Sequence, residues 1–338
     1  MIPEPDNALP EARQKVDGLR QEGRVEELAR ALESLARVAM KQADVAGAAA
    51  ALEEAGGLWR DLGSAEEAGS CLLLAASSYR LAAQPEDAKR VLDAGRRTAV
   101  PERIARGLAV EACEQDLANG KAEDAWRGFS QFLDQHGSAL APELLAQMLQ
   151  RRAAAAVACE RLTEAAADLL KASKIFVDSG KHADAEACAL AAAGVLASVD
   201  TTSAERIMTE IAASVPADGS AAARRGLVGG KVAMQAGEPA LALKRFDQAR
   251  QGALDATDPL SYLAAAVEAS HAAEAMGELK VAYAQLARAW GSLSDLLGRD
   301  AAEKMIKPEL EALRDRLGVP RFDAARQAYE DERRRAAS

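Results

Sequence analysis

The stretch QAGEPALALKRFDQAR, residues 235–250, decides the fold, because its pattern of small and large apolar residues recurs elsewhere in the chain. Gly237 is followed by a small residue at the fifth position, a large apolar one at the ninth and a small one at the twelfth: Ala242, Phe246 and Ala249. These offsets advance an α-helix by nearly whole turns, so the three side chains share one buried stripe. We expect Gly237 to close one helix in the left-handed conformation and Pro239 to begin the next, where a proline costs no hydrogen bond.

Copies of this frame occur along most of the chain. Further copies start at Gly277, Gly63 and Gly120, and looser ones at Gly23, Ala43, Ala83, Glu160, Gly180 and Val199. Successive starts often lie 20 residues apart, an interval that one helix and its turn would fill. A period of this kind is typical of a helical repeat array.

A second pattern precedes several of these turns. Leu52, Ala55, Gly56 and Trp59 come before Gly63, and residues 72–79 and 169–176 repeat the arrangement of a large residue, two small ones and an aromatic one. The small pair lets a neighbouring helix approach, and the aromatic side chain covers the remaining gap.

Together these patterns resemble the tetratricopeptide repeat (TPR), and the resemblance covers about residues 24–297. The period is nearer 40 than 34 residues, which is similar to the long repeats of soluble NSF attachment proteins and kinesin light chains. The stretch ALEEAGGLWRDLGSAEEAGSCLLLAASSYR, residues 51–80, is especially similar to the attachment-protein form. The resemblance implies an all-α fold, an αα-hairpin solenoid wound into a right-handed superhelix of about 16–17 antiparallel helices.

Proline or long polar connections divide the array into hairpins, because proline cannot continue an established helix. These connections are TAVPER, HGSALAPE, SVPADGS and DATDPL. The expected pairs are 24–41/44–62, 64–82/84–98, 101–119/121–136, 140–159/161–179, 181–198/201–214, 218–236/238–254, 257–276/278–297 and 299–317/321–335. With a leading helix at 8–22, we predict an N-terminal cap at 1–23, a hairpin array at 24–298, and C-terminal capping helices with a basic tail at 299–338.

Composition and charge exclude several classes of partner. The chain is 49% hydrophobic but only 4% aromatic, so small side chains must fill a helical interior. The net charge is -10, and Lys and Arg are scattered among acidic residues, which argues against nucleic-acid binding. The longest apolar run is too short to span a bilayer, and the first residues lack a signal-peptide pattern. We therefore expect a cytoplasmic protein without membrane insertion.

No motif for catalysis or metal binding emerges. In GLVGGKV, residues 226–232, glycines precede Lys231, as they do in a phosphate-binding Walker loop. Such a loop needs Gly at position 225 and Ser or Thr at position 232, whereas the chain has Arg225 and Val232. The alternative is that Gly226, Gly229 and Gly230 allow close helix packing. The three histidines have no metal spacing, and Cys71, Cys113, Cys159 and Cys188 are expected as reduced core residues. We predict that the chain is not an enzyme and needs no cofactor and no metal.

The resemblance implies a concave inner wall made by the first helix of each pair, which would bind a peptide or protein partner. The family's inward-facing positions correspond to Arg80, Glu114, Gln147, Gln150, Glu186, Arg224, Lys231, Met234, His271 and Glu274. Each of these could equally be a solvated side chain. The stretch from Arg224 to Lys231 is the most cationic part and predicts an acidic or carboxylate-ended partner segment.

Three classes of function follow. A protein-interaction scaffold or adaptor is the favoured interpretation, and a sensor or regulator that binds a small peptide or metabolite in the same groove is the alternative. An unrecognised enzyme is the third. Self-association through terminal hairpins also stays open. Trp59, Trp126 and Trp290 are expected to pack within the repeats first and to anchor interfaces second.

Overall fold

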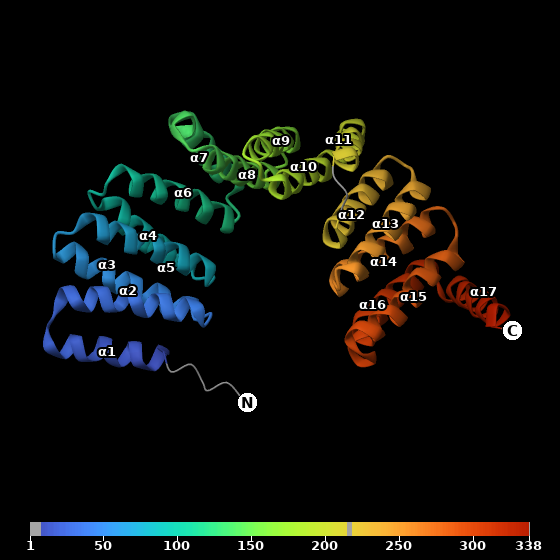
Figure 1. The fold of residues 1–338 in the computed structure, drawn as a ribbon, viewed down its shortest axis with the longest axis horizontal. Helices are drawn as coiled ribbons and strands as arrows, with labels where there is room; N and C mark the ends of the chain where they lie inside the picture. The colour runs from blue at the N-terminus through green and yellow to red at the C-terminus, as the bar shows by residue number, and fades with distance from the viewer. Residues whose placement is uncertain (1–7, 215–217, 338) are drawn as a thin grey trace. The chain divides into compact units, whose positions relative to one another are not determined.

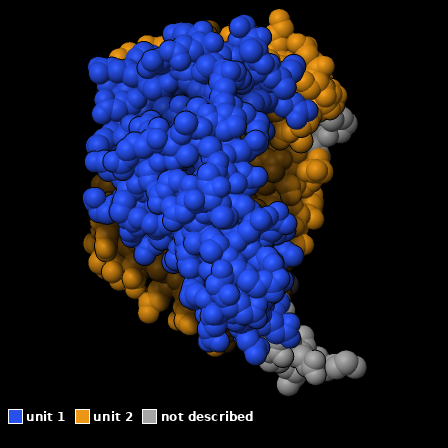
Figure 2. Space-filling model, turned by 90° about the vertical axis from the view of Figure 1, so that its left-hand side faces the viewer, with its two compact units in different colours: residues 1–160 blue, residues 161–338 orange. Residues whose placement is uncertain are grey.

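The computed structural model describes residues 8–214 and 218–337, and within these ranges the regular secondary structure is entirely helical. The chain forms two compact units, residues 1–160 and 161–338, which Figure 2 distinguishes by colour. Each unit is an all-α array in which every helix packs against its neighbours in the sequence. The expected pair 140–159/161–179 spans the division, so its two helices belong to different units.

Unit 1 holds eight helices among the described residues, and Figure 1 shows α1 to α6 lying one beside the next. They are α1 (Ala8–Glu22), α2 (Val25–Lys41), α3 (Val45–Asp61), α4 (Ala65–Leu81), α5 (Pro85–Arg97), α6 (Glu102–Ala118), α7 (Ala122–His136), the short 3-10 turn η1 (Gly137–Ala139) and α8 (Pro142–Ala158). Helix α4 also contacts α6, so first members of successive pairs are neighbours. We call α2, α4, α6 and α8 the first helices of unit 1.

Unit 2 holds nine helices in the part of the chain that is described. They are α9 (Leu162–Asp178), α10 (His182–Leu196), α11 (Thr201–Ser214), α12 (Gly219–Gln235), α13 (Pro239–Asp255), α14 (Pro259–Ala275), α15 (Leu279–Leu297), α16 (Arg299–Leu317) and α17 (Val319–Ala337). Helix α10 contacts α12, α12 contacts α14 and α14 contacts α16. These four are the first helices of unit 2, and the alternation of neighbours is that of stacked hairpins in a solenoid.

The turns explain the 20-residue interval. Helices α3 and α4 have 17 residues each, and residues 62–64 join them. Gly63 has φ 78° and its N–H bonds the Arg60 carbonyl, while the Ser64 N–H bonds the Trp59 carbonyl. This is a Schellman closure, in which the last helical carbonyls find donors and the chain reverses at once. A left-handed residue therefore marks the start of every expected frame except the one at Val199.

The same closure also forms where the sequence offers no glycine. Ala43, Ala83, Glu160 and Thr257 all adopt φ between 54° and 60°. A side chain in this conformation is strained by about 1–2 kcal/mol, so the surrounding packing must impose the turn. Thr257 lies in the DATDPL connection, which proves as short as the other turns. Its proline is the first residue of α14 and does not mark a longer break.

Small residues fill the interior as the frame predicts. Ala242, Phe246 and Ala249 are all fully buried. A Cβ at Gly226 would lie 2.6 Å from the Arg245 carbonyl oxygen, and one at Gly230 would lie 2.2 Å from the Phe246 ring. The glycines of GLVGGKV are thus contact points between α12 and α13, which confirms the packing interpretation of that stretch.

Candidate functional site

Ion pairs join successive first helices in unit 1. The Arg80 guanidinium of α4 donates to Glu111 of α6, with Nε–Oε1 at 2.8 Å and Nη2–Oε2 at 3.2 Å. Glu114 of α6 in turn lies 3.3 Å from Arg151 of α8. Two of the expected groove residues, Arg80 and Glu114, therefore hold neighbouring repeats together.

The first helices of unit 2 are connected in the same way. The Arg225 guanidinium of α12 donates to Glu186 of α10 through two hydrogen bonds of 2.7 Å. The other connections are Lys231 to Glu268 of α14 at 3.5 Å, and Arg316 of α16 to Glu274 of α14 at 3.1 Å. We call these five contacts in the two units the inter-repeat ion pairs.

Burial decides which of these pairs matters for stability. The Arg80–Glu111 side chains are 21% and 7% exposed, and those of Arg225 and Glu186 are 14% and 19% exposed. The hydrogen bond to Glu111 raises the pKa of Arg80, and the one to Glu186 raises the pKa of Arg225. Removing one partner of such a shielded pair leaves a charge without compensation, which costs about 3–5 kcal/mol. The Lys231 side chain is 60% exposed, so its pair contributes far less.

The remaining groove residues of the sequence prediction have different surroundings. Gln147 is exposed and Gln150 half-buried on α8, while Met234 packs against the buried cluster around Ala233 and Phe246. His271 lies beside Glu268 on α14, and hydrogen bonding from His271 lowers the pKa of Glu268. Arg224 is exposed on α12. The structure thus brings at least six of the ten residues into polar contacts between or along first helices, and their part in binding stays a prediction.

Two adjoining pockets lie between the first helices of unit 1. The first, of about 780 Å³, lies between α2 and α4 and includes Met40, Cys71 and Leu74. The second, of about 510 Å³, is lined by α4, α6 and α8 and includes Leu73, Leu74, Val110, Leu144 and Met148. Both are lined by Leu74, and we call them together the first-helix groove.

Charged side chains line the groove beside its apolar residues. Glu33, Arg37, Lys41, Glu66 and Glu67 line the pocket between α2 and α4. Arg103, Arg106 and Arg151 line the other pocket, together with Glu102 and with Glu111, which Arg80 neutralises. The groove therefore combines an apolar strip with a border of mixed charge.

Unit 2 has a more polar pocket of about 800 Å³ between α9, α10, α11 and α12. Among its lining residues are Glu186, Arg224 and Arg225, with His182 and Glu210. Two expected groove residues, Glu186 and Arg224, therefore meet here. Lys231, which the sequence analysis grouped with Arg224, is not among the lining residues and pairs with Glu268 instead.

The His, Cys, Asp and Glu side chains of the described residues form no metal-binding cluster. Among them, no group of three or more His, Cys, Asp or Glu residues could hold a metal ion. Burial raises the pKa of the Cys71 thiol to about 12 and that of Cys113 to about 11, so both are neutral near pH 7. Cys71, Cys113 and Cys188 are buried and form no disulfide, as expected for core residues, whereas Cys159, at the end of α8, is only half-buried. None of the described helices is both long and apolar enough to cross a bilayer.

Glu111 and Arg225, which belong to two of the inter-repeat ion pairs, could not be recognised from the sequence of their own helix alone. What would identify them is a residue of opposite charge about one repeat away in the sequence. The separation is 31 residues for Arg80–Glu111 and 39 residues for Arg225–Glu186. Leu74 was missed as well, although it is the centre of the groove.

In architecture, the chain is similar to TPR-like helical repeats among known proteins. Solved structures that match include the TPR-like repeats of a Podosopora anserina chain described as a putative kinesin light chain, at 15% identity over 67% of this chain and 95% of that one, with a TM-score of 0.41. A single-substitution variant of the same repeats matches at 16% identity, with coverages of 67% and 94% and a TM-score of 0.39. No protein-family model and no curated protein matches the sequence. The assignment to an all-α solenoid rests on the helices themselves.

Proposed function

We propose that the protein is a non-enzymatic protein-interaction scaffold whose first-helix groove in unit 1 binds a segment of a partner protein. The observation that carries this proposal is the exposed apolar strip of the groove. Met40, Leu74 and Leu144 are 42%, 55% and 42% exposed, and they come from three different first helices. A segment laid across these helices would contact all three side chains at once.

Leu74 distinguishes this strip from ordinary surface apolar residues. Among the described residues, it is the one strongly exposed large apolar side chain that lies more than a turn from a helix end. The others lie at or near helix ends, and of these Met40 and Leu144 also line the groove, whereas Leu62 and Leu260 do not. Isolated apolar residues at turns need no explanation, whereas an apolar side chain within a groove is typical of an interaction surface.

The charged border supports a chemistry for the partner. Arg103, Arg106 and Arg151 line the part of the groove formed by α6 and α8. Each already pairs with a carboxylate, namely Glu66, Glu102 and Glu114, so an acidic partner would exchange with these solvent-exposed pairs. An apolar segment with acidic residues at one end would place them beside these guanidiniums. Such charges contribute to specificity and to the association rate more than to affinity.

Replacement of Leu74 tests the proposal. We expect Leu74→Ser to leave the melting temperature nearly unchanged, because the side chain is half exposed, and to weaken partner binding by about tenfold or more, as loss of an anchor residue does. Leu260→Ser, with a side chain that is 70% exposed on α14, is the matched control. Wild-type, Leu74→Ser and Leu260→Ser chains are used to capture partners from native cell extracts, with quantification by mass spectrometry.

The partner identified is then titrated against the three proteins by calorimetry. Loss of one partner with Leu74→Ser alone, reproduced as a weaker Kd, supports the groove as the binding surface. Equal capture and equal Kd for all three proteins would place binding elsewhere and refute this role of the groove.

A further inference from the structure

A third hollow in unit 1 has a different character from the groove. It lies where α3 ends, α4 begins and α5 ends, with a volume of about 550 Å³. It is lined by Arg60, Gly63, Ala65, Ala94, Arg97, Thr98 and Ala99, and we call it the turn pocket. It shares no lining residue with the first-helix groove. Glycine and three alanines leave it open, since none of them has a side chain long enough to fill it.

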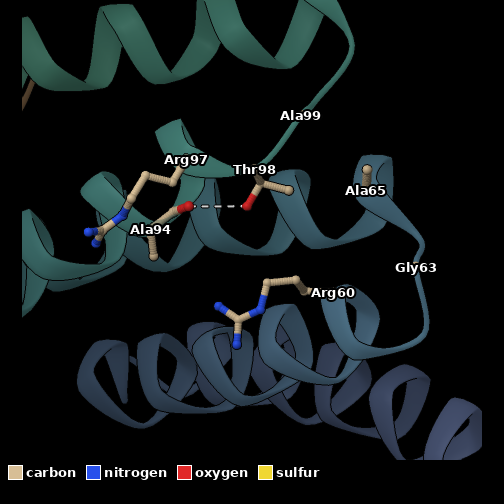
Figure 3. Close-up of a pocket in the computed structure, with 7 residues that line it drawn as sticks. All are labelled: Arg60, Gly63, Ala65, Ala94, Arg97, Thr98 and Ala99. Carbon is tan, nitrogen blue, oxygen red and sulfur yellow. Dashed lines mark hydrogen bonds between the residues drawn. The ribbon is translucent and has the colours of Figure 1, made fainter.

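The charge of the turn pocket is of one sign. Arg60 and Arg97 line it without any carboxylate, whereas the groove pockets and the pocket of unit 2 each include Glu or Asp. Figure 3 shows the two guanidiniums extending in the same direction, one from α3 and one from α5. In a chain of net charge -10, a pocket lined by cations alone is a marked local exception.

Neither arginine forms a shielded ion pair like those of Arg80 and Arg225. The Nε of Arg60 lies 3.7 Å from Oδ1 of Asp61, a carboxylate that is 73% exposed, and such a contact contributes little. The Nε of Arg97 donates to the Asp93 carbonyl at 3.1 Å. Within the described residues, neither guanidinium uses its terminal nitrogens in these contacts. The helix C-termini nearby supply only about half a negative charge each, so net positive charge remains.

Thr98 completes the geometry of the pocket. Its hydroxyl donates to the Ala94 carbonyl at 3.1 Å, as Figure 3 shows, so the hydroxyl is not a free donor for a ligand. The side-chain donors that remain are guanidinium N–H groups, whose planar pairs match the oxygens of phosphate and carboxylate. Both guanidiniums could donate to the oxygens of one phosphate monoester, which carries about two negative charges near pH 7.

From this combination we propose that the turn pocket binds a phosphate monoester group, with Arg60 and Arg97 as its ligands. The proposal does not depend on the first-helix groove, because the two sites have no residue in common. The ester belongs either to a small molecule or to a phosphorylated side chain of another protein, and the recognition chemistry is the same for both.

Inorganic phosphate is the first probe, titrated into the full chain at constant ionic strength with chloride as the reference. We expect Arg60→Ala/Arg97→Ala to lose roughly tenfold or more in phosphate affinity, since two charge-assisted contacts disappear. Arg30→Ala/Arg127→Ala is the matched control, because these arginines are 69% and 67% exposed, lie outside the pocket and remove the same charge. Far-ultraviolet circular dichroism verifies that all variants are folded.

Two further titrations distinguish a small phosphate ester from a phosphorylated protein as the ligand. Free O-phosphoserine and a short phosphoserine peptide are compared, each with its unphosphorylated form. Tighter binding of the peptide indicates a phosphorylated protein, and equal binding indicates a small ester; in both cases the affinity must fall in Arg60→Ala/Arg97→Ala. Equal phosphate affinity in wild type and that variant, or an equal loss in the control pair, would overturn the proposal.

Discussion

Replacing glycine by alanine should destabilise the protein at Gly226, where α12 contacts α13, and stabilise it at Gly291 in α15. A Cβ at Gly226 would lie 2.6 Å from the Arg245 carbonyl oxygen and 2.7 Å from the Ala249 amide nitrogen, whereas ordinary contact begins at 3.4 Å. Both are backbone atoms, so α13 would have to move away as a whole. A Cβ at Gly291, within α15, would meet nothing within 4 Å. Gly291→Ala is therefore the matched control for Gly226→Ala.

The magnitudes follow from two effects. Replacing glycine by alanine inside a helix stabilises it by about 1 kcal/mol, and both variants gain this. Gly226→Ala also overpacks the interface, at about 1–3 kcal/mol and towards the upper end because the obstacle is backbone. We expect Gly226→Ala to lower the free energy of unfolding by about 1–2 kcal/mol and Gly291→Ala to raise it by about 1 kcal/mol.

Urea unfolding followed by circular dichroism measures both changes. Gly229→Ala provides an intermediate case, because its Cβ would meet the flexible ends of Met208 and Arg245 at 3.1 and 3.2 Å. Its stability should lie between those of the other two variants. A Gly226→Ala chain as stable as wild type, or a shift of Gly226→Ala and Gly291→Ala in the same direction, would refute the close-approach role of Gly226.

Four further outcomes are expected. Thr257→Gly should raise the free energy of unfolding by about 1 kcal/mol in urea titration, because it relieves a φ of 54°; no gain would mean that the turn is unstrained. Ala242→Leu should lower the melting midpoint through a cost of about 1–3 kcal/mol, and an unchanged midpoint would show that the stripe is misplaced. The hydrogen bond from Arg90 lowers the pKa of Glu53 in the folded protein. The ionised Glu53 therefore stabilises the fold above its unfolded-state pKa of about 4.3, and this stabilisation is lost as pH falls through the lower folded-state pKa. Glu53→Gln should thus be less stable than wild type by about 1 kcal/mol at pH 7, and the difference should shrink as pH falls through the lowered folded pKa of Glu53; a difference independent of pH would contradict this. Cys71, with a pKa of about 12, should resist iodoacetamide at about pH 8 until urea unfolds the chain, and rapid labelling of the native protein would contradict its burial.

The helices could be predicted from the sequence because most of the described turns have a left-handed residue at a fixed place in the frame. Gly63 and Gly237 adopt this conformation. Ala43 and Glu160 adopt the same conformation, although neither favours it, because the apolar stripe on either side already dictates the turn. Val199, another expected frame start, does not; there Asp200 accepts a hydrogen bond from the Ser203 N–H at 3.0 Å and begins α11 without a left-handed residue.

The candidate site was less predictable, because burial depends on which neighbour each helix face meets. In the run Leu72, Leu73 and Leu74, successive side chains point about 100° apart around α4. Leu72 is 3% exposed and Leu74 is 55% exposed. The frame that starts at Gly63 correctly places Leu72 in the buried stripe, but it does not say that Leu74 lies in a groove between first helices. Likewise, a charge on one first helix is recognisable, but its partner belongs to another helix at a separation that varies from pair to pair.

The inter-repeat ion pairs also constrain how such a chain can change over evolution. Arg316 and Glu274, for example, are 42 residues apart in the sequence and 3.1 Å apart in space. For the two shielded pairs, Arg80–Glu111 and Arg225–Glu186, reversal of one charge should be compensated by reversal of its partner about one repeat away, while the other pairs are unaffected. Related sequences should therefore show coupled exchanges between Arg or Lys and Glu at this spacing, which would allow hairpins to be aligned where glycine turns have been lost.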